Sequence, residues 1–215
     1  RGLGDVYKRQ GANLSAEDKE KLKKINNELS LLAIKFGNNL LKETNNYRLV
    51  IDNEKDLSGL PAGVVAAAAE TAKEAGLEGK WVFTLHNPSV MPFLQYADNR
   101  NLREQIYRAY TNRGNNNNEY DNKEVISKLI ALKTEKANLL GFPDYASYVL
   151  DENMAKNPEN VYSLCNQIWE AALKVAKKEA ATLQKMINKT DGSFQLQPWD
   201  WRYYACLLYT SDAAD

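Results

Sequence analysis

Long segments in which apolar residues recur at steps of three and four are the feature that most limits how this chain can fold. One such segment spans residues 15–43, and its apolar stripe consists of Leu22, Ile25, Leu29, Leu32, Phe36 and Leu40. Another spans residues 157–188, and its stripe consists of Val161, Leu164, Ile168, Ala172, Val175, Leu183, Met186 and Ile187. This spacing covers one face of an α-helix, because the helix turns once every ~3.6 residues. The two segments therefore predict long amphipathic helices and a mainly α fold.

Capping and turn signals predict where further helices begin and end. Asn157 followed by Pro158 is typical of a helix start. Gly192 is expected to break the second long helix before another begins at Pro198. Shorter helices are predicted over residues 61–75, 89–97, 101–113, 123–140 and 143–151.

Two short segments have the β-branched and aromatic character of strands. They are Tyr47-Arg-Leu-Val-Ile51 and Trp81-Val-Phe-Thr-Leu85. These segments could pair with each other. The sequence thus predicts a multi-helix lobe with one small β element near residues 47–51 and 81–85.

The charge balance and the cysteine content exclude several classes of protein. The chain carries 28 Lys and Arg residues against 28 Asp and Glu residues, so it lacks the positive charge expected of a protein that binds nucleic acid or an anionic membrane. No apolar run is long enough to span a membrane. Two cysteines cannot form a disulfide framework. We therefore expect no nucleic-acid partner and no membrane partner.

The single histidine, His86, limits the catalytic sites that this sequence can build. A zinc site, a Ser-His-Asp triad or a Cys-His pair would all depend on it, and no second histidine is present to help ligate a metal. The motifs H-E-x-x-H, G-x-S-x-G and the P-loop pattern are absent from the sequence. We therefore predict a structural or surface role for His86, and we assign no catalytic, cofactor-binding or metal-binding residue in this chain.

Three other features suggest chemistry but have simpler interpretations. The acidic segment Asp52-Asn-Glu-Lys-Asp56 resembles a calcium loop, yet such a loop needs Gly at its sixth position and Glu at its twelfth, where this chain has Leu57 and Gly63. Cys165 lies on an apolar helix face and is predicted to be buried as a small hydrophobic residue rather than a nucleophile. The aromatic cluster Trp199, Trp201, Tyr203 and Tyr204 is predicted to pack in a core rather than stack on bases.

The two ends of the chain are predicted to have a common, non-native origin. Residues Asp5–Gln10 can be back-translated as GAT GTG TAT AAG AGA CAG, and the reverse complement, shifted by one base, encodes Cys206-Leu-Leu-Tyr-Thr. That DNA sequence resembles the transposase adapter of sequencing libraries. We therefore expect residues 1–10 and 206–215 to be adapter-derived, residues 11–205 to be native, and Cys165 to be the native thiol.

Six segments taken in order resemble one family of enzymes. They are Asp56-Leu-Ser-Gly-Leu-Pro61, Trp81-Val-Phe-Thr-Leu-His-Asn-Pro-Ser-Val90, Gln95-Tyr-Ala-Asp-Asn-Arg100 with Leu102-Arg-Glu-Gln-Ile-Tyr-Arg-Ala-Tyr110, Leu139-Leu-Gly-Phe-Pro-Asp-Tyr-Ala-Ser-Tyr148, Met154-Ala155 and Pro198-Trp-Asp-Trp-Arg-Tyr-Tyr204. This order and spacing resemble the thimet oligopeptidase and peptidyl-dipeptidase family of zinc metallopeptidases, and the bacterial dipeptidyl carboxypeptidases within it. The resemblance covers most of residues 11–205 but a minority of a full family chain.

The resemblance implies a mostly helical enzyme in which zinc is held by an H-E-x-x-H helix and a later glutamate. In the family, the motif's glutamate activates the zinc-bound water, and the metal polarises the scissile carbonyl of a short peptide. These residues follow the segments quoted above, so none of their roles passes to a position of this chain, and His86 matches no ligand. We expect zinc in the parent protein, none in this chain, and short peptides as the parent's substrates.

A second interpretation, a helical binding or scaffold domain without a catalytic partner, stays open on the residues alone. The cytoplasm is the expected compartment, with the periplasm or export as alternatives, and the oligomeric state is open. Because the helices that would cover residues 157–188 are expected after Ala205, we predict exposed apolar side chains in this chain, Val175, Leu183, Met186 and Trp199 among them.

Overall fold

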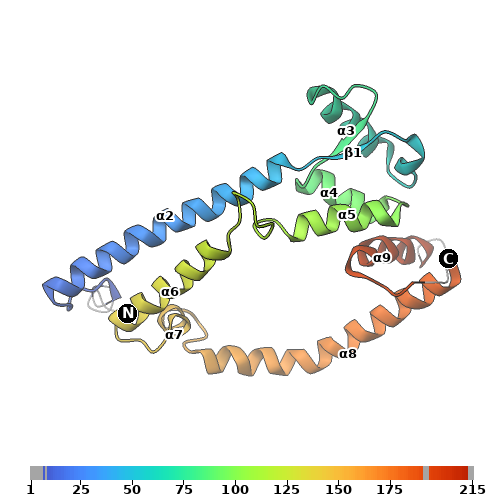
Figure 1. Ribbon diagram of the computed structural model, residues 1–215. Coiled ribbons are helices and arrows are strands. Elements are labelled where there is room, and N and C mark those ends of the chain that lie inside the picture. Colours follow the sequence, from blue (N-terminus) through green and yellow to red (C-terminus); the bar gives the residue numbers. More distant parts are fainter. Residues whose placement is uncertain (1–6, 8, 191–193, 213–215) are drawn as a thin grey trace. The chain divides into compact units, whose positions relative to one another are not determined.

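The computed structural model describes residue 7, residues 9–190 and residues 194–212. The chain divides into two compact units, one formed by Arg1–Leu40 and Asn117–Ala172, the other by Leu41–Asn116 and Leu173–Asp215. Helices form most of both units (Figure 1), and the strands in the described residues form one two-stranded sheet. The prediction of a mainly α fold with one small β element is therefore confirmed.

In the first unit, the beginning of helix α2 (Ala16–Asn46) lies against α6 (Lys123–Leu139). Lys21 Nζ lies 2.9 Å from Glu135 Oε1, and the buried Asn39 donates to Asn122 Oδ1 at 3.0 Å. Early residues of α2 thus meet late residues of α6, which shows that the two helices are antiparallel. The stripe predicted for this helix points inward, with Leu22 and Ile25 buried and Leu29, Leu32, Phe36 and Leu40 partly buried.

Helix α7 (Tyr145–Leu150) follows α6 through a tight turn in the first unit. Gly141 has a φ of 83°, a conformation that glycine adopts without a steric penalty, and it lies just past the end of α6. Asp144 caps α7 by accepting a hydrogen bond from the backbone N–H of Ser147 at 2.7 Å. This hydrogen bond favours the charged carboxylate and lowers the pKa of Asp144.

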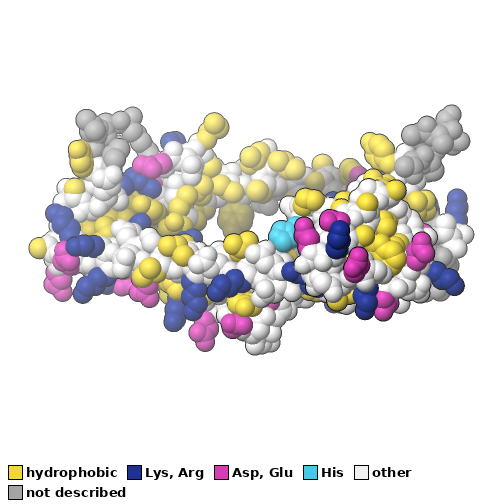
Figure 2. Space-filling model, turned by 90° about the horizontal axis from the view of Figure 1, so that it is seen from above, with side chains coloured by type: hydrophobic (Ala, Val, Ile, Leu, Met, Phe, Trp, Pro, Cys, Tyr) yellow, Lys and Arg dark blue, Asp and Glu magenta, His cyan; other side chains and the backbone are white. Residues whose placement is uncertain are grey.

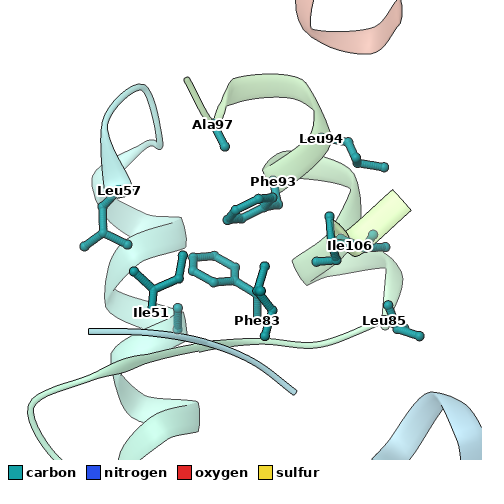
Figure 3. Close-up of a cluster of buried hydrophobic side chains, with 11 residues drawn as sticks. Ile51, Leu57, Phe83, Leu85, Phe93, Leu94, Ala97 and Ile106 are labelled. Atoms are coloured by element: carbon teal, nitrogen blue, oxygen red, sulfur yellow. The ribbon is translucent and has the colours of Figure 1, made fainter. Parts of the chain in front are cut away.

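The second unit contains the sheet and the larger hydrophobic core. Strand β1 (Leu49–Ile51) pairs antiparallel with β2 (Trp81–Phe83), so the paired segments are shorter than predicted. The sheet packs with α3 (Ala62–Glu74), α4 (Asn87–Tyr96) and α5 (Arg100–Thr111). Phe83 and Phe93 meet edge to face with ring centroids 4.6 Å apart, and Ile51 and Ile106 lie in the same cluster (Figure 3).

The second unit also contains the end of α2, a short 3-10 helix, η1 (Glu54–Leu57), the end of α8 (Pro158–Thr190), and α9 (Pro198–Asp212). Leu183 and Ile187 of α8 are buried together with Tyr204 of α9. The predicted break at Gly192 lies outside the described residues. Helix α9 includes residues 206–212, which belong to the segment that we assign to the adapter.

Burial along α8 differs from the sequence-based expectation in two ways. Cys165 is exposed rather than buried, because no other part of the described chain covers this section of the helix. Leu183 and Trp199 were expected to be exposed, yet only 3% and 8% of their surface is exposed. Leu183 of α8 packs against α9, and Trp199 of α9 lies against Tyr107 of α5. Val175 is 56% exposed, as expected.

None of the helices in the described residues has the length and apolar content that a membrane crossing requires.

Candidate functional site

A cluster of buried charges lies in the second unit, where the start of α9 meets the start of α5. Asp200 has no exposed surface, and Arg103 is 1% exposed. Arg100 contacts Asp200 with two nitrogens, its Nε 3.0 Å from Oδ1 and its Nη2 2.9 Å from Oδ2. Arg103 Nη2 donates to Asp200 Oδ1 at 3.1 Å. Charge-assisted and two-pronged hydrogen bonds are the strong ones among side chains, so Asp200 links the two helices.

The local sequence explains why these three side chains meet. Asn99 caps α5 by accepting from two backbone N–H groups of its first turn, which fixes where the helix begins. Arg100 and Arg103 then lie on one face, because residues three apart are neighbours on a helix. Asp200 accepts from the backbone N–H of Gln197 at 3.1 Å, while its own N–H donates to the Gln197 carbonyl at 2.9 Å. This reciprocal pair is a variant of the capping box, and it fixes the carboxylate at the start of α9.

A second carboxylate, Asp98, extends the cluster towards η1. Ser58 Oγ donates to Asp98 Oδ2 at 2.5 Å, and the Tyr203 hydroxyl donates to Asp98 Oδ1 at 2.8 Å. Arg103 Nη1 donates to the carbonyl of Asp98 at 3.1 Å. Burial, and then the hydrogen bond and negative charge of Asp98, raise the pKa of Tyr203. We refer to Asp98, Arg100, Arg103, Asp200 and Tyr203 as the Asp200 cluster.

Aromatic rings surround the arginines of this cluster. The guanidinium of Arg100 lies 4.1 Å from the ring centre of Phe194, and that of Arg103 lies 4.0 Å from the ring centre of Tyr203. Trp199 and Tyr204 are buried, whereas Trp201 is 37% exposed. The prediction that this aromatic cluster packs in a core is therefore confirmed for Trp199 and Tyr204, whereas Tyr203 is partly buried and Trp201 lies at the surface.

The arrangement positions helices and offers little to a substrate. Both oxygens of Asp200 accept hydrogen bonds from arginine, and one also accepts from Gln197. Asp200 and Arg103 are both buried, whereas the Arg100 side chain is 28% exposed. The sequence analysis gave Asp200 no role of its own. The Gln197-x-x-Asp200 spacing was a signal of its capping role, but nothing local pointed to the arginines.

A groove of about 510 Å³ lies between α8 and α9 in the second unit. Its lining is mainly apolar, with Val175, Leu183 and Trp201 beside the charged Lys178 and Glu179. Leu208 and Tyr209 also line it and belong to the segment that we assign to the adapter.

His86 and the acidic segment, which the sequence analysis considered as possible sites, make structural hydrogen bonds. His86 is exposed (Figure 2, cyan) and lies 3.1 Å from both Asn45 Oδ1 and Thr84 Oγ1, one at each ring nitrogen. In the acidic segment at 52–56, Asn53 caps η1 and Asp56 accepts a hydrogen bond from the Asn99 side chain at 2.8 Å. These contacts give both features structural roles.

The residues present do not fit a zinc ion. Within residue 7, residues 9–190 and residues 194–212, no group of three or more His, Cys, Asp or Glu side chains is placed to hold a metal. Three or four such side chains make up a zinc site in proteins, and the chain has a single histidine. We therefore derive no chemical step through a metal from these residues.

Comparison with known proteins gives the class of this chain. A family model described as "Peptidase family M3" matches residues 93–211, which is more than half of the sequence and contains Arg100, Arg103 and Asp200. The chain belongs to peptidase family M3, the family to which its six segments point.

Relatives in bacteria and plants are similar over most of this chain. The dipeptidyl carboxypeptidase of Escherichia coli (strain K12) is 37% identical over 195 residues, which cover 91% of this chain. Oligopeptidase A of the same organism is 36% identical over 203 residues and 93% of this chain. The organellar oligopeptidase A of Arabidopsis thaliana is 36% identical over 200 residues and 86% of this chain. The chain spans only 29%, 30% and 25% of the lengths of these three relatives.

Proposed function

We propose that these residues are the non-catalytic helical part of a zinc-dependent oligopeptidase that hydrolyses short peptides. The observation that carries this proposal is the 37% identity to a dipeptidyl carboxypeptidase over 91% of the chain. The parent protein therefore releases dipeptides from the C-terminus of short peptides. The other relatives are named oligopeptidases, which supports short peptides as the substrate class.

The zinc ligands and the catalytic residues belong to a part of the parent protein outside these 215 residues. The family resemblance supports an H-E-x-x-H helix downstream of the Pro198 segment as their position. The single histidine of this chain supports this division, because H-E-x-x-H needs two. In the parent, the Asp200 cluster fixes α9 against α5. It thereby sets the direction in which the polypeptide continues after α9.

Activity measurements on two proteins test the proposal. The 215-residue chain and the parent protein, expressed from the source gene with its native downstream sequence, are each incubated with zinc and a short peptide with a fluorescent reporter. We expect hydrolysis by the parent alone, and its loss on addition of a chelator. Chelator-sensitive hydrolysis by the 215-residue chain would contradict the assignment of the site. A parent gene without H-E-x-x-H and without hydrolysis would favour the helical binding domain.

The adapter origin of residues 1–10 and 206–215 is tested by sequencing the source DNA. We expect the genomic sequence to diverge from this chain before residue 11 and after Ala205. Genomic codons that encode residues 1–10 and 206–215 as they stand in this chain would contradict the adapter origin. We further propose that the parent acts in the cytoplasm and binds neither nucleic acid nor a membrane.

A further inference from the structure

A guanidinium group is held at the surface of the first unit by residues that follow α6 and residues at the end of α7. The guanidinium is that of Arg9, and its central carbon lies 4.2 Å from the ring centre of Tyr148 and 5.6 Å from that of Phe142. Arg9 Nε lies 2.9 Å from Glu152 Oε1, and Arg9 Nη1 donates to Asp151 Oδ2 at 3.2 Å. The Arg9 side chain is only 13% exposed. We refer to Phe142, Tyr148, Asp151 and Glu152 as the guanidinium site.

Local structure of the α6–α7 segment holds the guanidinium site in place. The backbone N–H of Phe142 donates to the carbonyl of Ala137 at 2.9 Å, and that of Asp151 donates to the carbonyl of Ser147 at 3.2 Å. Phe142 and Tyr148 pack edge to face with ring centroids 5.3 Å apart. All of these contacts join residues of one segment to each other. The two rings and the backbone that carries Asp151 are therefore in position whether or not a cation is bound.

The geometry of the site suits a guanidinium better than an ammonium group. A guanidinium is planar, so it can lie over an aromatic ring while its edge donates hydrogen bonds to carboxylates. Arg9 does both at once, because two different nitrogens contact two carboxylates and its plane lies against Tyr148. A lysine carries its charge on one strongly hydrated nitrogen and would make fewer of these contacts together.

The charges around the site favour one bound cation. Asp151 and Glu152 each contribute one negative charge, and Lys136, whose Nζ lies 5.8 Å from the ring centre of Tyr148, contributes one positive charge. Lys136 donates to Asn26 Oδ1 at 2.7 Å, which holds its ammonium group on another partner. Two negative charges and one positive charge leave a balance of −1, which a single guanidinium neutralises.

Arg9 belongs to the segment that we assign to the adapter, and on that assignment the parent protein lacks it. We propose that in the parent protein the guanidinium site binds an arginine side chain of a separate peptide, whose position Arg9 occupies in this chain. The side chains of Asp151 and Glu152 are 41% and 49% exposed, so an arginine from solution can reach them. The proposal rests on the adapter assignment and not on peptidase activity.

Removal of Arg9 gives a direct test. The probe is N-acetyl-arginine amide, and saturation-transfer NMR measures its binding to the 215-residue chain and to the same chain with Arg9→Ala. We expect Arg9→Ala to bind the probe with a Kd in the millimolar range, because cation–π contacts and exposed ion pairs are individually weak. The unchanged chain should bind at least about fivefold more weakly, since its tethered Arg9 competes for the site. Equal binding by the two proteins, or no binding by Arg9→Ala, would overturn the proposal.

Two comparisons in the Arg9→Ala chain test the geometry. Adding Glu152→Gln should weaken binding about two- to fivefold, as expected for the loss of one exposed ion pair. Adding Glu159→Gln instead is the matched control, because Glu159 is an exposed glutamate of α8, and binding should not change. N-acetyl-lysine amide should bind at least about twofold more weakly than the arginine probe. Equal effects of the two glutamine substitutions, or equal binding of the two probes, would contradict the proposed site.

The parent protein, expressed from its source gene, provides the last measurement. It should bind the arginine probe as the Arg9→Ala chain does, and Glu152→Gln should weaken that binding. No binding, or binding that Glu152→Gln leaves unchanged, would overturn the proposal, as would genomic codons that encode Arg9. An inactive parent that binds the probe at this site would defeat the proposed function and leave this inference standing. An active parent that does not bind it would do the reverse.

Discussion

At the scale of single residues, Gly59 lies in a turn that has no room for a side chain. Its φ is +83°, and a Cβ atom there would lie 2.2 Å from the carbonyl oxygen of Tyr96. That oxygen is part of the backbone and cannot retreat as a flexible side chain could. Gly59 therefore allows η1 to lie against the end of α4, where Ser58 reaches Asp98.

Replacing this glycine should be costly. We expect Gly59→Ala to lower the free energy of unfolding by more than about 1 kcal/mol, since it combines a left-handed φ with a clash. Gly63→Ala is the matched control, because Gly63 lies in α3 with nothing within 4 Å of its Cβ position, and it should stabilise by about 0.4–1 kcal/mol. Urea denaturation measures both changes. Equal effects of the two variants would show that the turn is not fixed as described.

The Asp200 cluster gives a second residue-scale prediction. Asp200→Asn removes the negative charge that faces two arginines, one of them buried, and breaking a buried pair in this way costs about 3–5 kcal/mol. Glu104→Gln, the control, breaks a pair with Arg108 that is 2.7 Å long and exposed, which should cost only about 0.3 kcal/mol. Unfolding curves of the two variants provide the comparison, and a loss for Asp200→Asn as small as that of the control would contradict the structural role of the cluster.

At the scale of elements, the attachment of α9 should depend on pH through Tyr203. The pKa of this phenol is raised in the folded state by burial and by Asp98, whereas in the unfolded chain it is about 10. A raised folded pKa adds stability below the unfolded pKa, and this stability is lost as the pH rises above about 10.

The variant Tyr203→Phe removes this dependence together with the hydrogen bond to Asp98. We expect it to be less stable than the wild type at pH 8, and the difference should shrink as the pH is raised through 10 and 11. Urea midpoints at each pH measure the difference. Tyr162→Phe, at a 68% exposed position, should follow the wild type throughout, and a difference for Tyr203→Phe that stays constant with pH would contradict the pKa argument.

At the scale of the whole molecule, the open apolar surface of α8 should limit cooperativity. Each apolar side chain left in water forfeits roughly 1.5–3 kcal/mol of burial, and a domain has only about 5–15 kcal/mol of net stability. Leu164, Ile168, Trp169 and Val175 are each more than half exposed.

We therefore expect the 215-residue chain to be helical by circular dichroism, to unfold over a broad temperature range, and to bind a hydrophobic dye. The parent protein should unfold sharply and bind little dye. A sharp two-state transition of the 215-residue chain with negligible dye binding would show that it is a self-sufficient domain and would favour the binding-domain alternative.

Local sequence signals determined most of the secondary structure of this protein. The three-and-four spacing of apolar residues predicts α2 and α8, because helix geometry repeats within a few residues. Asn157 and Gly141 likewise fix helix ends through contacts with their own neighbours: Asn157 Oδ1 accepts from the N–H of Asn160, and Gly141 adopts a positive φ. These signals need no information from distant parts of the chain.

The tertiary structure alone decided which of these surfaces are covered and which charges meet. Arg103 and Asp200 are 97 positions apart, and no local pattern encodes a contact at that separation. Cys165 and Leu183 lie on the same apolar face of α8, yet one is exposed and the other buried, because only Leu183 has α9 against it. Periodicity specifies which face of a helix is apolar, whereas burial depends on whether another element lies against that face.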